Sequence, residues 1–179
     1  MRHVLAVLVE NNPGVLARVA ALIRRRGFNI ESLAVGPTED RRISRMTLAV
    51  EGDDAIVEQV EKQLNKLVEV LKVSDLDAEN SVTRELALVK VHAEPSRRAQ
   101  ILQLADIFRA RVVDVGRRHM TIEVTGTQDK VEALINLARE YGIQEVVRTG
   151  VIALERGGTA VKYEKEDVPN DAAVLRLGR

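Results

Sequence analysis

Apolar positions change period several times along the first 76 residues of the chain. Residues 4–9 form an unbroken apolar run, which is typical of a strand buried in a sheet. Residues 15–23 carry apolar side chains at every third or fourth position, and this spacing predicts an amphipathic helix. Residues 43–50 alternate between apolar and polar side chains, as a half-buried strand does. The pattern predicts, in order, a strand at 4–9, a helix at 15–26, strands at 28–35 and 43–50, a helix carrying residues 56–67 and a strand at 68–73.

The same order of elements recurs in the second half of the chain. Pro95 and Ser96 open one predicted helix, and Thr127 caps another that ends at Gly142. The strands are expected at 86–92, 112–115, 120–125 and within 143–154. Each half therefore predicts a βαββαβ unit, in which both helices cover one face of an antiparallel sheet. The expected fold class is α+β, with two ferredoxin-like domains in tandem.

Segments of different composition set the expected domain boundaries. The first domain is predicted over residues 1–76, followed by an acidic and polar linker at 77–84 and a second domain at 85–157. Residues 158–179 are charged and show only a weak apolar stretch near their end, so we expect a flexible tail. A single ferredoxin-like unit leaves one sheet face and at least one sheet edge uncovered. Homodimerisation is therefore expected on physical grounds.

Charge and composition exclude several classes of function. The 179 residues include 27 basic and 27 acidic side chains, whereas nucleic-acid and membrane-surface binders usually carry an excess of basic residues. Two tyrosines, two phenylalanines and no tryptophan give few surfaces on which bases could stack. The absence of cysteine excludes disulfides and thiolate chemistry. No signal peptide or membrane span is apparent in the sequence, so a cytoplasmic location is expected.

Candidate catalytic residues are scarce. His3, His92 and His119 do not stand at metal-ligand spacing, and phosphate-binding glycine loops and nucleophile-elbow motifs are missing from the sequence. We therefore predict no catalytic residue, no metal site and no cofactor on this chain. The paired and tripled arginines fall at predicted turns and helix ends, where solvated charge costs little.

The junction at residues 11–18 is the strongest candidate for a ligand site. The first N–H groups of a helix lack intrahelical partners, and the helix dipole adds positive potential there. Asn12 is a suitable helix cap, Pro13 suits the first helical position, and Gly14 lets a ligand approach the backbone. A carboxylate would fit here, with the Asn11 amide accepting from an ammonium group. The junction thus favours binding of a free amino acid, and Asn29 of a second copy could face it in a side-by-side dimer.

Several motifs resemble one known family. Asn11-x-x-Gly14-Val15-Leu16-x-Arg18 and Arg26-Gly27-Phe28-Asn29-Ile30-Glu31-Ser32-Leu33 are similar to the N-terminal ACT domain of the regulatory small subunit of acetolactate (acetohydroxyacid) synthase. Ser44-Arg45-Met46-Thr47, Glu61-Lys62-Gln63-Leu64, Glu85-Leu86-x-Leu88-Val89-Lys90-Val91 and Ile107-Phe108-Arg109-Ala110 strengthen the match. The resemblance covers about residues 1–157 and leaves the tail outside.

This resemblance implies a non-catalytic subunit that activates a separate enzyme of branched-chain amino-acid biosynthesis. The holoenzyme is a transferase, and thiamine diphosphate, Mg and FAD are expected on its catalytic large subunit. The end product, usually valine, is expected to bind at the ACT dimer interface and withdraw the activation. Carried over to this sequence, one subunit supplies Asn11, Gly14, Val15 and Leu16, and the other supplies Asn29 and Ile30. The second domain is assigned by the same resemblance to dimer stability and contact with the large subunit.

A free-standing amino-acid sensor that regulates another enzyme or a transcription factor is the alternative. The sequence has no helix-turn-helix of its own, which disfavours direct control of DNA. An enzyme is the third interpretation and would require turnover by the isolated chain. The sequence leaves open whether valine, leucine or isoleucine is preferred.

Overall fold

The computed structural model describes residues 2–25, 28–158 and 160–163. The chain divides into two compact units. Unit 1 comprises Met1–Ser81 together with Leu154–Arg179, and unit 2 comprises Val82–Ala153.

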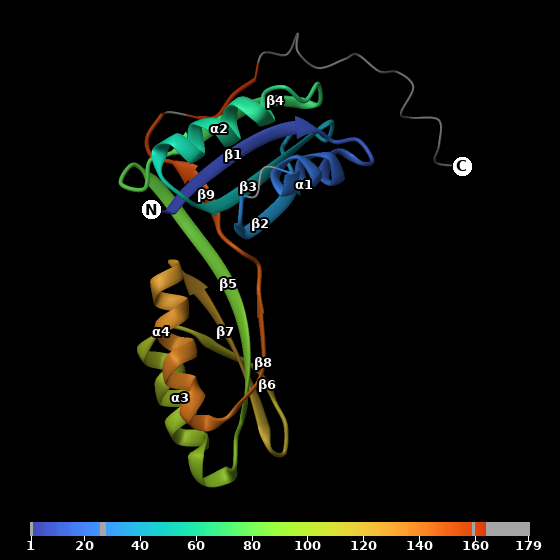
Figure 1. The fold of residues 1–179 in the computed structure, drawn as a ribbon. Coiled ribbons are helices and arrows are strands. Elements are labelled where there is room, and N and C mark those ends of the chain that lie inside the picture. The colour runs from blue at the N-terminus through green and yellow to red at the C-terminus, as the bar shows by residue number, and fades with distance from the viewer. Residues whose placement is uncertain (1, 26–27, 159, 164–179) are drawn as a thin grey trace, which may run out of the picture. The chain divides into compact units, whose positions relative to one another are not determined.

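Unit 1 is built on a four-stranded antiparallel sheet with the strand order β2-β3-β1-β4 (Figure 1). Its register is fixed by pairs such as Leu5 with Leu48 and Val7 with Met46. The connecting elements follow the predicted βαββαβ order. They are β1 (Arg2–Glu10), α1 (Val15–Arg25), β2 (Ile30–Pro37), β3 (Ile43–Glu51), α2 (Asp54–Leu64) and β4 (Val70–Leu76).

Both helices of unit 1 cover the same face of the sheet. The predicted stripe of α1 is buried together with residues of α2, except for Leu16, which is exposed. The buried members are Val15, Val19, Leu22 and Ile23 of α1 and Val57, Val60 and Leu64 of α2. Asp53 starts α2, because its Oδ1 accepts a 2.8 Å hydrogen bond from the N–H of Ile56. This layer is the core of the unit: Leu5, Val7, Val9, Val15, Val19, Leu22, Ile23, Met46, Leu48, Val50, Val57, Val60 and Leu64.

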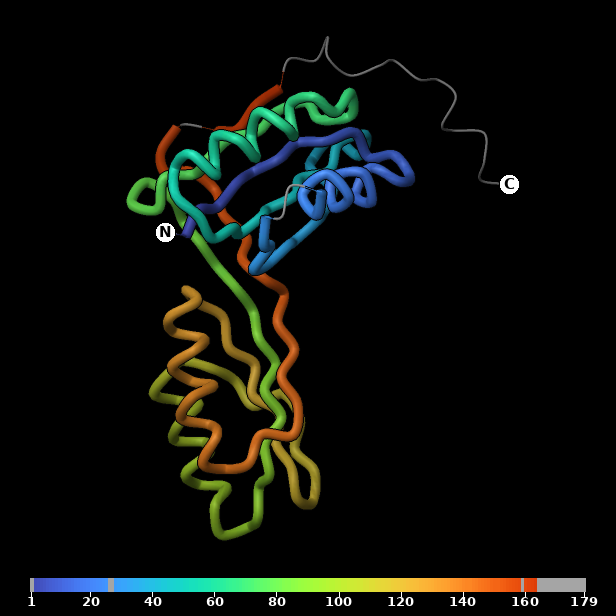
Figure 2. Tube along the Cα trace, in the orientation of Figure 1, coloured from blue at the N-terminus to red at the C-terminus, as the bar shows by residue number. Residues whose placement is uncertain are grey.

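The opposite face of this sheet is also partly covered, by the end of the chain. Leu8 and Ile43 are buried there, and Val161 and Tyr163 pack against them. We call residues 160–163 the strap; they form the last coloured stretch of the trace in Figure 2. The predicted flexible tail starts at residue 158, and within it Val161 and Tyr163 pack against the sheet, while 159 and 164–179 lie outside the described residues. The flexibility of the tail stays a prediction. Val161 and Tyr163 alone give no periodic pattern, so the sequence does not predict that they pack on strands far from them along the chain.

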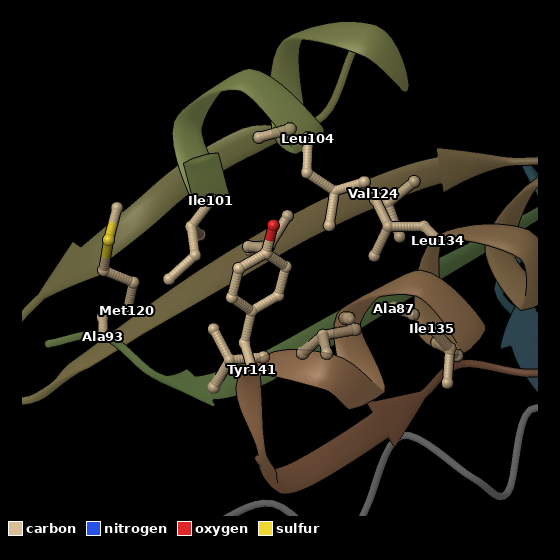
Figure 3. Close-up of a cluster of buried hydrophobic side chains, with 14 of the residues drawn as sticks. Ala87, Ala93, Ile101, Leu104, Met120, Val124, Leu134, Ile135 and Tyr141 are labelled. Carbon is tan, nitrogen blue, oxygen red and sulfur yellow. The ribbon is translucent and has the colours of Figure 1, made fainter. Parts of the chain in front are cut away.

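Unit 2 repeats the arrangement with the strand order β6-β7-β5-β8. Figure 3 shows its core, where Ile101 and Leu104 of α3 and Leu134 and Ile135 of α4 gather with Tyr141. Its elements are β5 (Ser81–His92), α3 (Arg98–Ile107), β6 (Arg111–Val115), β7 (His119–Gly126), α4 (Gln128–Ala138) and β8 (Ile143–Arg148), with short 3-10 turns η1 (Pro95–Arg97) and η2 (Arg139–Tyr141). Strand β9 (Ile152–Glu155) begins in unit 2 and ends in unit 1. Thr127 caps α4 as predicted.

The predicted linker at 77–84 is too long. Strand β5 begins at Ser81, so only residues 77–80 connect it to β4. The single strand expected within 143–154 is in fact two, β8 and β9, and β9 also pairs with β5. The charged residues Arg84 and Glu85 made this part of β5 resemble a polar linker in the sequence. Glu85 is nevertheless buried, because it pairs with Arg148, far along the chain. Among the described residues, no helix is long and apolar enough to cross a bilayer.

Candidate functional site

The loop between β1 and α1 turns at Gly14, which has a φ of +87°. The Gly14 carbonyl accepts the first helical hydrogen bond, from the N–H of Arg18 at 3.1 Å, so Gly14 takes the N-cap position of α1. The sequence predicts that the helix starts at Pro13 with Asn12 as cap, and this is wrong. A proline cannot adopt a positive φ, so the turn is made by the glycine after it. The Asn12 amide instead donates to Glu10 Oε2 at 2.8 Å.

The backbone at this turn is open. A Cβ placed on Gly14 would meet nothing within 4 Å, although the positive φ strains any residue other than glycine there. Among the first N–H groups of α1, that of Val15 makes a long hydrogen bond of 3.4 Å to the Asn12 carbonyl, and that of Leu16 has no carbonyl within the helix to bond. Donors of this kind, at the positive end of a helix dipole, favour a carboxylate.

The side chains of Val15 and Leu16 take different positions. Val15 is 4% exposed and belongs to the core, so only its backbone faces the candidate site. Leu16 is 43% exposed and presents an apolar surface beside Gly14. Arg18, one turn further on, forms an ion pair with Glu69, which fixes the start of α1 next to the start of β4.

Asn11 is held by the loop between β2 and β3, residues 38–42, which we call the hairpin loop. The Asn11 N–H donates to the Arg42 carbonyl at 2.7 Å, and its Nδ2 donates to the Arg41 carbonyl at 2.9 Å. These two bonds orient the side-chain amide so that Nδ2 faces the hairpin loop. The acceptor Oδ1 at the other end of the amide is the group that suits an ammonium.

Asn29 and Ile30 lie at the far end of α1. Asn29 is exposed immediately before β2, and Ile30 is half-buried and pairs with Val50. Helix α1 has 11 residues, which corresponds to a length of about 16 Å. The structure thus brings together Asn11, Gly14, Val15 and Leu16, and it leaves Asn29 and Ile30 of the same chain apart from them.

Sequence reasoning missed the residues that support the site. These residues are in the hairpin loop. The carbonyls of Arg41 and Arg42 accept hydrogen bonds from Asn11, and Asp40 accepts one from the Arg42 N–H and so stabilises the loop. Their spacing in the sequence is typical of an ordinary polar turn, and only the pairing of β1 with β3 places them beside Asn11.

The three histidines make structural contacts. His3 Nδ1 lies 3.1 Å from Asp75 Oδ2, His119 Nε2 lies 3.1 Å from Asp114 Oδ2, and His92 contacts the Gln144 amide. Over the described ranges, histidine and carboxylate side chains do not form any group of three that could hold a metal ion.

Two family profiles cover most of the chain. The profile described as "AHAS small subunit-like ACT domain" matches residues 5–72, and the profile "Small subunit of acetolactate synthase" matches residues 84–157. A protein named probable acetolactate synthase small subunit, from Archaeoglobus fulgidus, is 63% identical over 157 residues, which are 88% of this chain and 98% of that protein. The chain belongs to the acetolactate synthase small-subunit family.

Other members of the small-subunit family agree. The acetolactate synthase small subunit of Mycolicibacterium smegmatis is 53% identical over 163 residues, covering 91% of this chain and 96% of that protein. The crystal structure of the small subunit from Thermotoga maritima matches with a TM-score of 0.83 and 46% identity, over 89% of this chain and 99% of that one. These matches confirm the predicted family and the tandem ferredoxin-like fold with an N-terminal ACT domain.

Proposed function

We propose that this chain is the regulatory subunit of an acetolactate synthase, a partner that activates a separate catalytic large subunit. The observation that supports this most directly is the match to small subunits along nearly the whole chain. Thiamine diphosphate, Mg and FAD would then be carried by the large subunit, where acetolactate and acetohydroxybutyrate are made. Unit 2 would contribute to contact with that subunit and to stability of the dimer.

The effector is a branched-chain amino acid bound at the turn around Gly14. Its carboxylate would meet the N–H groups at the start of α1, and its ammonium would meet Asn11 Oδ1. The exposed side chain of Leu16 offers an apolar surface for a small branched side chain. The open space around Gly14 supports this close approach to the backbone.

A second copy of the chain would complete the pocket with Asn29 and Ile30. Within one chain these residues lie a helix length away from Gly14. Strand β2, which follows Asn29, stands at an edge of its sheet, and Val35 on it is 46% exposed. An edge strand with an exposed apolar side chain suits pairing with another copy.

A pocket shared between two copies lets a ligand change the quaternary state. To regulate activity, valine must bind one arrangement of the complex more tightly than the other. A coupling of about 1–3 kcal/mol, equivalent to roughly a 5- to 150-fold change in affinity, is usual for such systems.

The test is to mix the purified chain with the catalytic subunit of the same organism and to measure acetolactate formation with and without valine. We expect stimulation that valine reverses. Stimulation without a valine effect would retain the regulatory-subunit assignment and reject valine as the effector. A lack of stimulation would reject the assignment and favour the free-standing sensor.

A further inference from the structure

The hairpin loop makes hydrogen bonds in two directions. On one side, the carbonyls of Arg41 and Arg42 accept from Asn11. On the other side, Asp40 Oδ2 accepts a 3.1 Å hydrogen bond from the hydroxyl of Tyr163, in the strap. Tyr163 and Asn11 therefore bond to the same five-residue loop, although Tyr163 lies 152 positions further along the chain (163 − 11).

The Asp40 side chain stabilises the conformation of the hairpin loop. Its Oδ1 accepts from the Arg42 N–H at 3.0 Å and from Arg42 Nε at 3.1 Å, and its Oδ2 accepts from Arg42 Nη2 at 2.7 Å. The Arg42 guanidinium and backbone N–H hold the pKa of Asp40 well below its ordinary value, and the Tyr163 hydroxyl adds to this effect. The Arg42 N–H that Asp40 bonds and the Arg41 carbonyl that accepts from Asn11 Nδ2 belong to one planar peptide group, so moving Asp40 also moves the acceptor of the Asn11 side chain.

The strap packs on the sheet of unit 1 through partly buried side chains. Val161 and Tyr163 pack on Leu8 and Ile43, and a cavity of about 190 Å³ remains between the strap and the sheet. This cavity is lined by Leu8, Pro37, Thr38, Glu39, Arg45, Val161 and Tyr163. Because Val161 and Tyr163 are only partly buried, we expect the strap to open at a lower free-energy cost than the sheet, which lets its hydrogen bond to Asp40 break while the sheet stays folded.

We propose that Tyr163 is a positioning residue for the amino-acid site. Through Asp40 and the hairpin loop it holds the Asn11 amide in the orientation that presents Oδ1 to the ligand's ammonium. This inference rests on the proposed function of the Gly14 turn, and it adds a regulatory role for the strap. Since binding free energies are reciprocal, a ligand at Asn11 also stabilises the docked strap.

The first experiment measures valine binding to the full chain by calorimetry. Tyr163→Phe keeps the ring that packs on Leu8 and removes only the hydroxyl, so we expect valine affinity to fall about five-fold. The matched control is Tyr141→Phe, the same change at the other tyrosine, which lies in the core of unit 2; valine affinity should stay unchanged. Equal affinity of wild type and Tyr163→Phe, with valine still bound by both, would overturn the inference and leave the proposed function standing.

A double variant tests whether the effect passes through Asp40. Asp40→Asn and Tyr163→Phe together should weaken valine binding no more than Asp40→Asn alone, since both interrupt the same connection. Additive losses would show that the two residues act independently and would contradict the proposal.

A second measurement separates positioning from a general loss of stability. Hydrogen exchange of the strap amides should slow when valine is added to the wild-type chain, and this slowing should be absent in Asn11→Ala. If valine binding does not change hydrogen exchange of the strap amides, the proposed connection between Tyr163 and Asn11 is rejected. If the wild-type chain binds no valine at all, valine is rejected as the effector and the inference fails with it, while the regulatory-subunit assignment is decided by the stimulation of the catalytic subunit.

Discussion

Arg148 holds both carboxylate oxygens of Glu85. Its Nε and Nη2 each donate at 2.8 Å, one to each oxygen, while Nη1 donates to Glu132 at 3.1 Å. The Glu85 side chain is only 3% exposed, whereas that of Glu132 is 45% exposed. The same arginine thus makes one buried ion pair and one solvated ion pair, and the two should differ in their contribution to stability.

Arg148→Met should destabilise unit 2 by about 2 kcal/mol, because it leaves a buried carboxylate without its partner. This value lies below the range of about 3–5 kcal/mol for fully buried pairs, since water reaches the 31% exposed arginine. Glu132→Gln, the control, should cost less than about 1 kcal/mol. Urea unfolding of both variants checks the difference, and equal losses would contradict the assignment of the buried pair.

Asp40 should make the stability of unit 1 depend on pH. Its folded-state pKa lies below the ordinary value of 3.8, so its contribution to stability is fully present above that value and is lost as the pH falls through the folded pKa. We expect wild type to melt above Asp40→Asn at neutral pH, and the difference to shrink on acidification below about pH 4. Thermal melts across that range test this, and a constant difference would speak against the lowered pKa.

Gly14→Asp should abolish the response to valine. The substitution strains the positive φ and places a negative charge where the ligand carboxylate belongs. Gly14→Asn is the matched control, because it has almost the same shape, tolerates positive φ better and carries no charge. Valine titration should detect weak binding by Gly14→Asn and none by Gly14→Asp. Wild-type valine sensitivity in Gly14→Asp would argue against the site.

Asn29→Ala should weaken valine binding and leave the fold and the activation of the catalytic subunit unchanged, because Asn29 is exposed. The sharper test mixes this variant with Gly14→Asp. A heterodimer of the two contains one pocket with both defects and one pocket with neither. When subunits exchange freely in an equimolar mixture, about half of the dimers are heterodimers, so calorimetry should recover about a quarter of the wild-type sites. A mixture that binds no better than its components would show that the two residues do not share a pocket across an interface.

Much of the fold could be predicted from local patterns. The stripe from Val15 to Ile23 and the alternation in residues 43–50 each follow the period of one element, and the structure confirms the helix and the strand. The prediction that this strand is half-buried is wrong, because Ile43, Thr47 and Ala49 on its second face are buried as well. The second βαββαβ unit was visible for the same reason. The start of β5 was not visible, because Glu85 is buried by an ion pair with Arg148, and a partner 63 positions away leaves no local signal.

The candidate site could be predicted only as separate groups of residues. Gly14 stood out because a glycine at a strand-to-helix turn has a specific conformational use, although the sequence placed the helix start too early. The hairpin loop and Tyr163 did not stand out, because their relation to Asn11 depends on strand register and on the return of the chain to the first sheet. Which copy of the chain supplies Asn29 depends on assembly, which no local pattern encodes.

Helix α1 separates Gly14 from Asn29, so in the proposed dimer each copy of the chain supplies Gly14 to one pocket and Asn29 to the other. Occupancy of such a pocket is linked by mass action to association of the subunits. Valine would lower the dissociation constant of the dimer, and dilution of the protein would lower its apparent affinity for valine. The sensitivity of a cell to the amino acid would then depend on how much of the small subunit it makes, as well as on the amino-acid concentration.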